Sequence, residues 1–167
     1  MSITLHRGDI ITDAEADAIV TAANSGLRGG GGVDGAVHRA AGPALLAECR
    51  RIGGCPTGDA VITGAGDLPV RHVIHAVGPV WHGGDRGEPD QLASCHRRSV
   101  ELAAEHGCAR VAFPAISCGV YGYPVDLAAG VALAATAAAL AEHPTVVEAR
   151  FWLFDEAALD AFRAALP

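Results

Sequence analysis

Short apolar runs alternate along this chain with longer segments in which apolar residues recur every three or four positions. The short runs are typical of buried strands, and the longer spacing is typical of amphipathic helices. The expected strands are residues 3–5, 18–22, 60–63, 72–77, 110–113 and 146–154. The expected helices are residues 35–41, 43–52, 88–106, 126–142 and 155–166, with Asp126 and Asp155 where N-caps belong. This alternation predicts an α/β layered domain with a largely parallel sheet, in which ligands bind beyond the carboxyl ends of the strands.

Composition narrows the class of protein. The chain has 167 residues, of which 50% are hydrophobic, so we expect one domain over residues 1–167 with a real core and, by default, a monomer. Its formal net charge of -7 argues against direct binding of nucleic acid, which needs a basic face. A single anionic ligand remains compatible with this charge, because backbone amides and helix N-termini can hold phosphate. All 12 basic residues are arginine, which excludes a lysine nucleophile.

Cysteine usage and the apolar stretches indicate a cytoplasmic protein. The five cysteines are odd in number and form no CxxC pair, which argues against a disulfide framework and a zinc finger. No long apolar segment that would mark a signal peptide is visible at the N-terminus. The uncharged stretch 127–141 would span roughly 22 Å as a helix, less than the ~30 Å of a bilayer core. We therefore expect a buried helix there and no membrane association.

The spacing of the histidines indicates no metal site. His72 and His75 are three residues apart in an expected strand, which places them on opposite faces. His82 and His96 have no recognisable ligand spacing around them. No cofactor is expected either.

The first candidate site segment runs from an expected strand through four glycines, 29–32, into an expected helix. Glycines let the backbone approach a ligand closely, and Asn24 and Asp34 offer the donors and acceptors that suit vicinal sugar hydroxyls. The alternative is that Asp34 only caps the helix and that the glycines form a mobile turn. His38 follows Asp34 by four residues, so it lies on the same helix face, where it would orient Asp34, line the cleft or serve structure alone.

The second segment is a Ser/Gly/Tyr loop after the expected strand 110–113. Ser117, Cys118, Gly119, Val120 and Tyr121 supply consecutive backbone N–H groups, which suit a diphosphate. The alternative is an ordinary turn between strand and helix. The GK[ST] element of a Walker A loop is missing, and no positive partner marks Cys118 as a nucleophile.

A third signal follows the first expected strand. Asp9 can accept a hydrogen bond from an exocyclic amine, and the Ile10 amide can contact a ring nitrogen. Phe154, at the end of the last expected strand, can stack on a base. Each has a structural alternative: a strand-end turn for Asp9 and Ile10, and a core aromatic for Phe154.

Together these segments resemble the macrodomain family, specifically its MacroD-type branch. The resemblance rests on GDI (8–10), DAIVTAAN (17–24), GGGGVDGAVHRAAG (29–42), CPTG (55–58), VIHAVGP (73–79) and FPAISCGVYGYP (113–124). These motifs occur in the family's order and cover almost the whole chain. They imply a three-layer α/β/α fold with a central mixed, largely parallel sheet and a cleft for ADP-ribose.

The resemblance also implies roles for individual residues. Adenine would meet Asp9 and Ile10, with Phe154 a less certain stacking partner; the distal ribose would meet Asn24 and Asp34. The diphosphate would lie on residues 117–121, and Ala23, Gly32, Val33 and His38 would complete the binding residues. Asn24, Asp34 and Gly119 would form the catalytic set. The family commonly has Asn at Thr21 and Thr at Cys118; the first difference alters or removes a hydrogen bond near the site, and the second should matter little.

The expected function is hydrolysis of ADP-ribose esters. The MacroD-type branch removes mono-ADP-ribose from acidic side chains and deacetylates O-acetyl-ADP-ribose, so ADP-ribose and ADP-ribosylated proteins are the expected partners. Asp34 with its helix and the glycine loop favours catalysis, whereas Thr21 mildly favours a non-catalytic ADP-ribose reader. A phosphatase acting on ADP-ribose 1''-phosphate is a second alternative. A poly-ADP-ribose glycohydrolase lacks support because Glu48 stands alone, and no GxGxxG follows the first strand as a dinucleotide dehydrogenase would require.

Overall fold

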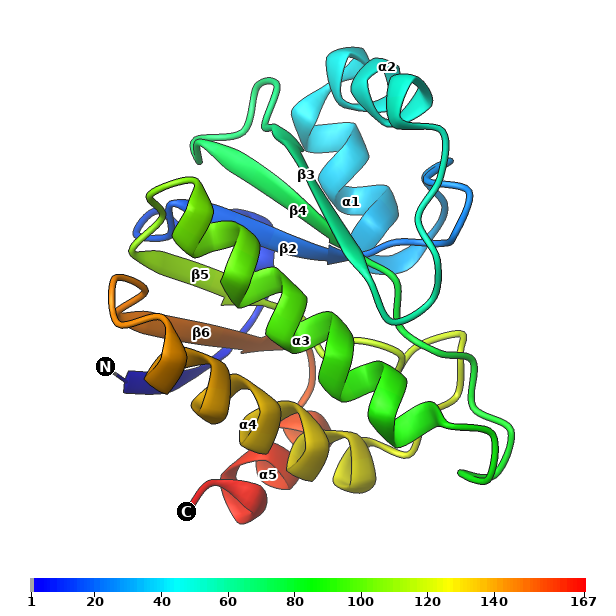
Figure 1. The fold of residues 1–167 in the computed structure, drawn as a ribbon, viewed down its shortest axis with the longest axis vertical. Coiled ribbons are helices and arrows are strands. Elements are labelled where there is room, and N and C mark those ends of the chain that lie inside the picture. The colour runs from blue at the N-terminus through cyan, green and yellow to red at the C-terminus, as the bar shows by residue number, and fades with distance from the viewer. Residues whose placement is uncertain (1) are drawn as a thin grey trace.

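The central sheet of the protein has six strands in the order β1-β6-β5-β2-β4-β3, as seen in a computed structural model that describes residues 2–167 (Figure 1). The strands are β1 (Ser2–Arg7), β2 (Ala18–Ala22), β3 (Ala60–Gly64), β4 (His72–Ala76), β5 (Arg110–Phe113) and β6 (Glu148–Leu153). The helices are α1 (Gly32–Ala41), α2 (Pro43–Ile52), α3 (Glu88–Glu105), α4 (Val125–Glu142) and α5 (Glu156–Ala165), with a 3-10 turn at Ile10–Thr12. All neighbouring strands pair in parallel except β3, which is antiparallel to β4. The mixed, largely parallel sheet predicted from the sequence is therefore confirmed.

Helices cover both faces of this sheet, so a central strand such as β2 buries residues on both of its faces. Successive residues of β2 point to opposite faces: Ala18 and Val20 join the core under α3, α4 and α5, whereas Ile19 joins the core under α1 and α2. Figure 1 shows α3 and α4 in front of the sheet and α1 behind it. The three-layer α/β/α arrangement is thereby confirmed.

The predicted elements are all present, with shifted ends. Helix α1 begins at Gly32, three residues earlier than predicted, and β6 ends at Leu153. The Asp155 carboxylate accepts a hydrogen bond from the Ala158 amide, as an N-cap should. The prediction for Asp126 is wrong, because α4 begins at Val125 and Asp126 lies inside its first turn.

Helix α4 is the predicted uncharged helix. Its 18 residues and mean hydropathy of 1.5 satisfy the length and composition of a membrane span. One face of α4, which includes Ala129, Ala132 and Leu140, is buried in the core that α4 shares with the sheet, α3 and α5. Leu127, on another face of the helix, is exposed. The expected burial therefore applies to one side of the helix.

A buried ion pair fixes the segment after β1. The Arg150 Nε of β6 donates to Asp13 Oδ2 at 2.8 Å, and the Trp152 indole donates to the same oxygen at 2.7 Å. Arg150 also meets Glu148 at 2.9 Å. Burial alone would raise the pKa of Asp13, but hydrogen bonds from Arg150, the Glu15 amide and Trp152 hold it below its usual value. The turn that carries Asp9 and Ile10 is thus tied to the sheet.

Arg150→Met is expected to lower the free energy of unfolding by about 3 kcal/mol, because it leaves the Asp13 carboxylate buried without its cation. Urea denaturation at pH 7 measures this change. Arg163→Met breaks an exposed pair with Asp160 and should cost less than about 1 kcal/mol. Equal costs for the two variants would show that the Asp13 pair does not anchor the turn.

Candidate functional site

A cleft of about 290 Å³ opens at the carboxyl ends of β2 and β5. These adjacent strands lead to opposite layers, because β2 continues to α1 and β5 continues to α4. Such a reversal leaves a crevice between the two connections, where α/β proteins bind ligands. Three loops and the start of α1 form its wall: Ala22, Ala23, Asn24, Gly30, Gly31, Gly32, Val33, Asp34, Gly78, Pro114, Ala115, Ile116, Ser117, Gly119, Val120 and Tyr121.

Asp34 is the carboxylate of this cleft. It is the third residue of α1, whose N-cap is Gly31, so the interpretation of Asp34 as a cap is wrong. The buried Thr21 hydroxyl of β2 donates to Asp34 Oδ1 at 3.0 Å, and His38 Nε2 lies 3.6 Å from the same oxygen. Asp34 Oδ2 has no hydrogen-bond partner within residues 2–167. One oxygen is therefore held by the protein while the other remains available to a ligand.

The surroundings of Asp34 set its proton affinity. Burial raises its pKa above the usual value, while the Thr21 hydrogen bond and the charge of His38 oppose that rise. A raised pKa makes the carboxylate a stronger base once it is deprotonated. As the pH is lowered, a reaction that needs the charged carboxylate should therefore begin to slow at a higher pH than it would with an ordinary aspartate.

Thr21→Val should raise the pKa of Asp34 further, because it removes the hydrogen bond that favours the charged form while keeping the side-chain shape. The chemical shift of the Asp34 carboxyl carbon, followed by NMR against pH, measures this. Thr136→Val is the control, since the Thr136 hydroxyl on α4 is buried without a partner among the described residues. An unchanged Asp34 titration in Thr21→Val would contradict the role given to this hydroxyl.

Asn24 shapes the loop on one side of the cleft. Its side-chain amide donates to Gly29 O at 2.8 Å, and its Oδ1 accepts from the Arg28 amide at 3.0 Å. These bonds close the loop between β2 and the glycines. A Cβ at Gly35 would overlap Gly30 O, so the glycine loop rests against the first turn of α1. The loop is thus held by hydrogen bonds from Asn24 and by packing against α1.

The opposite wall carries free backbone donors. Within residues 2–167, no acceptor pairs with the N–H groups of Ser117, Gly119, Val120 and Tyr121. The same holds for Gly32 and Val33 at the N-terminus of α1. Unpaired amides on two sides of a concave site can hold an anion such as phosphate without a cationic side chain.

The cleft includes most, but not all, of the residues predicted for the site. It gathers Ala23, Asn24, Gly32, Val33, Asp34, Ser117, Gly119, Val120 and Tyr121. The other five predicted residues lie outside its wall. Cys118 donates to Ile116 O, and burial raises the pKa of its thiol to about 12, which agrees with its interpretation as a loop residue. His38 contacts Asp34 without lining the cleft.

The three residues predicted for a nucleobase also lie beyond this wall. Asp9 caps the 3-10 turn by accepting from the Ile11 amide, and Ile10 is buried in the core. Phe154 follows β6 with 78% of its surface exposed, so it is not a core aromatic. Its exposed ring remains compatible with the predicted stacking.

Gly78 is a cleft residue that the sequence analysis did not select. A Cβ at this position would overlap Ser117 Oγ and Ile116 Cγ2, so the loop after β4 packs directly against the loop after β5. In the sequence Gly78 belongs to the VIHAVGP motif (73–79) and stands in a Gly-Pro pair directly after an expected strand, but neither feature gave it a role in the site. Two loops that are 39 residues apart in the chain therefore depend on one glycine.

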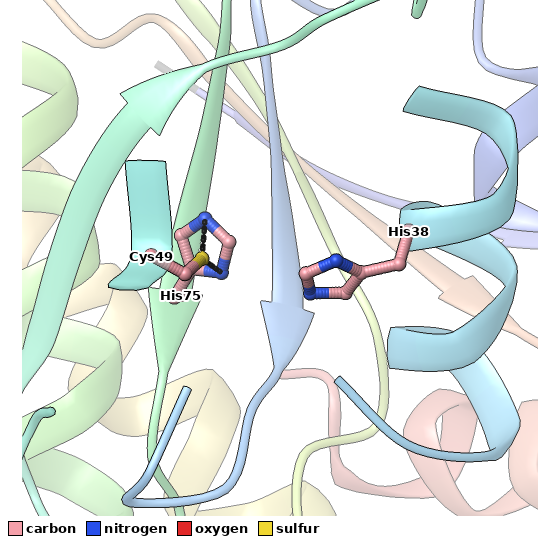
Figure 2. A group of neighbouring side chains, drawn as sticks. All are labelled: His38, Cys49 and His75. Atoms are coloured by element: carbon pink, nitrogen blue, oxygen red, sulfur yellow. Dashed lines mark hydrogen bonds between the residues drawn. The ribbon is translucent and has the colours of Figure 1, made fainter. Parts of the chain in front are cut away.

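Three potential metal ligands come together behind Asp34 from three elements. Atoms of His38, Cys49 and His75 lie within 4.8 Å of one another, and Figure 2 shows the His38 ring pointing toward the other two. Sequence spacing had no means of finding this group. The Cys49 sulfur lies 3.8 Å from both ring nitrogens of His75, so it faces the ring rather than one lone pair. Burial raises the pKa of the Cys49 thiol to about 11 and lowers that of His75 to about 4, so the surroundings favour the uncharged forms of these two side chains.

The fold and the cleft together define an α/β protein with unpaired backbone amides, suited to an anionic ligand, beside one buried carboxylate. The Macro domain model matches residues 20–132. A macro domain-containing protein of Chlorobaculum tepidum is 54% identical over 93% of this chain and 91% of its own. An O-acetyl-ADP-ribose deacetylase of Klebsiella pneumoniae is 53% identical over 95% of this chain and 93% of its own.

Solved structures show the same fold. A macrodomain of Oceanobacillus iheyensis with ADP superposes with a TM-score of 0.91, at 39% identity over 96% of this chain and 87% of its own. A macrodomain of Trypanosoma brucei in complex with ADP-ribose gives 0.90, at 42% identity over 97% of this chain and 68% of its own. This chain belongs to the macro domain family.

Proposed function

We propose that this protein binds ADP-ribose and hydrolyses esters of it. The substrates would be O-acetyl-ADP-ribose and proteins that carry mono-ADP-ribose on acidic side chains. Two kinds of relative support the proposal: macrodomains with ADP or ADP-ribose bound, and relatives of more than half identity that are named O-acetyl-ADP-ribose deacetylases.

The ligand would lie along the cleft with its phosphates on the free amides of Ser117, Gly119, Val120 and Tyr121; the Cys118 amide, predicted to join them, instead donates to Ala115 O. The distal ribose would reach the loop closed by Asn24 and the start of α1, beside Asp34. Adenine would extend beyond the cleft toward Asp9, Ile10 and the exposed ring of Phe154. This placement satisfies the unpaired amides with the anionic part of the ligand and leaves the sugar next to the carboxylate.

Hydrolysis then needs only a water molecule and the groups in the cleft. Asp34 would orient a water or take a proton from it, sharing that role with the substrate's own phosphate. The water oxygen would then attack the ester carbonyl. The amide of Gly119 would stabilise the negative charge that develops, and Asn24 would hold the loop against the ribose. The acyl bond to the ribose oxygen breaks and that oxygen receives the proton taken from the water. The acid leaves as a carboxylate after its own proton, the second from the water, passes to solvent. Positioning contributes to the rate without a covalent intermediate.

The observation that carries this proposal is the position of Asp34. A buried carboxylate with a raised pKa and one uncommitted oxygen stands in the wall of an anion-binding cleft. A protein that only binds ADP-ribose needs the amides but has no use for such a base. The geometry therefore favours a hydrolase over a reader.

Acetate release from O-acetyl-ADP-ribose by the purified protein tests the proposal, with calorimetry of free ADP-ribose in parallel. Turnover and binding are both expected. Tight binding without acetate release would make the protein a reader. The second alternative, ADP-ribose 1''-phosphate hydrolysis, requires release of inorganic phosphate from that compound at a comparable kcat/KM.

A further inference from the structure

Uncompensated positive charge is concentrated beside the cleft of this acidic protein. Residues 24–54 contain four arginines and two acidic residues, whereas the whole chain carries a net charge of -7. Neither acidic residue pairs with an arginine: Asp34 is buried and accepts from the Thr21 hydroxyl, and the Glu48 carboxylate accepts from the Gly64 amide. The ion pairs found within residues 2–167 involve other arginines, so these four are available to a partner.

Two of these arginines share a pocket. Arg28 and Arg50 line a hollow of about 400 Å³ whose remaining wall is small or apolar: Gly26, Leu27, Leu46 and Gly53. Both arginines are exposed. A guanidinium presents a planar fork of donors that matches a carboxylate, and two such groups in one hollow can bind neighbouring carboxylates.

This pocket lies on the loop that forms the cleft wall. Asn24 lines the cleft, and its Oδ1 accepts from the backbone amide of Arg28. The Arg28 side chain folds back over the loop, since a Cβ at Gly26 would lie 2.9 Å from its Nε. The loop is also fixed to the chain after α2, because the Cys55 amide donates to Ser25 O. The Arg28–Arg50 pocket therefore adjoins the loop that, in the proposed function, lies against the distal ribose.

We propose that the Arg28–Arg50 pocket binds carboxylates of an acidic protein segment next to the ADP-ribosylated residue. The inference rests on the proposed function, because the acceptor protein is joined to ADP-ribose at the distal ribose. A segment rich in Glu or Asp is the occupant that two unpaired guanidiniums on an otherwise acidic surface would select. The pocket makes no contact with small substrates, so it affects recognition of the protein and not the chemistry.

Two synthetic peptides, each with one glutamate that carries mono-ADP-ribose, test the proposal. Acidic residues flank the modified glutamate in the first peptide, and the matching amides flank it in the second. The wild type is expected to show a KM about five- to tenfold lower for the acidic peptide at low salt, with similar kcat, and the preference should shrink as salt rises. Arg28→Gln with Arg50→Gln should abolish the preference and leave O-acetyl-ADP-ribose hydrolysis unchanged.

Arg97→Gln with Arg163→Gln, on α3 and α5 across the sheet, removes the same charge and should retain the preference. Arg28→Glu with Arg50→Glu should instead favour a peptide with lysine flanks, a gain that loss of folding cannot produce. Equal KM values for the two peptides in the wild type, with normal O-acetyl-ADP-ribose turnover, would overturn the pocket's role alone. Absence of turnover on every substrate would overturn the proposed function and this inference with it. Inhibition by a short oligonucleotide as strong as that by the unmodified acidic peptide would identify a phosphate site instead and overturn the choice of partner.

Discussion

Replacement of Asp34 by Asn is expected to lower kcat for ester hydrolysis by about 10²–10⁴-fold, the range that a general base contributes. The change keeps the shape of the side chain, and the amide oxygen can still accept the hydrogen bond from Thr21 that now measures 3.0 Å. It removes only the basicity of the uncommitted oxygen. Affinity for ADP-ribose should therefore change little, because the proposed binding mode holds the phosphates on backbone amides of the other wall.

Steady-state kinetics on O-acetyl-ADP-ribose and calorimetry with ADP-ribose separate the two effects. A loss confined to kcat identifies Asp34 as part of the reaction, whereas equal losses in kcat/KM and affinity would make it a binding residue only. The pH profile supplies a second readout. Burial raises the pKa of Asp34, and in the proposed mechanism only the deprotonated form is active. As the pH is lowered, the wild-type rate should therefore begin to fall at a pH above the usual pKa of aspartate. Thr21→Val should move that fall to still higher pH.

Gly78→Val should reduce kcat/KM by about a hundredfold, because displacement of binding groups by about 1 Å costs that much in a positioned site. Even a Cβ would overlap Ser117 Oγ and Ile116 Cγ2 at this position, and valine adds two more carbons. The loop after β5 must then move away from the loop after β4. The unpaired amides of residues 119–121 move with it, so affinity for ADP-ribose should fall as well, in contrast to Asp34→Asn.

Gly130→Ala is the matched control for this variant. Gly130 lies on the exposed side of α4, where a Cβ would meet nothing within 4 Å. The ADP-ribose affinity and the turnover of Gly130→Ala should equal those of the wild type. Unchanged ADP-ribose affinity in a folded Gly78→Val protein would show that the two loops are not coupled through this contact.

The sequence predicted the layers of the fold well, because its signal is local. The apolar runs of β2 and β5 and the helical spacing of α3 and α4 each fit within one window of the chain. The least accurate boundary was the start of α1, at Gly32, because glycine has poor intrinsic helix propensity. That segment is helical because its first turn packs against the loop closed by Asn24.

The sequence predicted the site residues that lie within contiguous motifs. It missed the residues whose role depends on contacts between segments far apart in the chain. The loop 117–121 and the residues Asn24 and Asp34 lie within two short segments, and the structure brings them to one cleft. The Thr21–Asp34 hydrogen bond joins a strand to a helix, so the sequence showed Thr21 only as a change of residue type. The structure shows that the threonine hydroxyl donates a hydrogen bond to Asp34. Gly78 packs against a loop distant in the chain, and Arg28 and Arg50 line one pocket from two different segments; no local pattern in the sequence records such contacts.

Release of mono-ADP-ribose from a protein modified on glutamate tests the central claim most directly. Purified wild type and Asp34→Asn are incubated with the labelled substrate, and loss of label from the protein is followed with time. Release by the wild type and its near-absence in the variant, with ADP-ribose affinity retained in both, is the result that the account predicts. Retention of the label by the wild type, while free ADP-ribose still binds tightly, would contradict it and make the protein a reader of ADP-ribose.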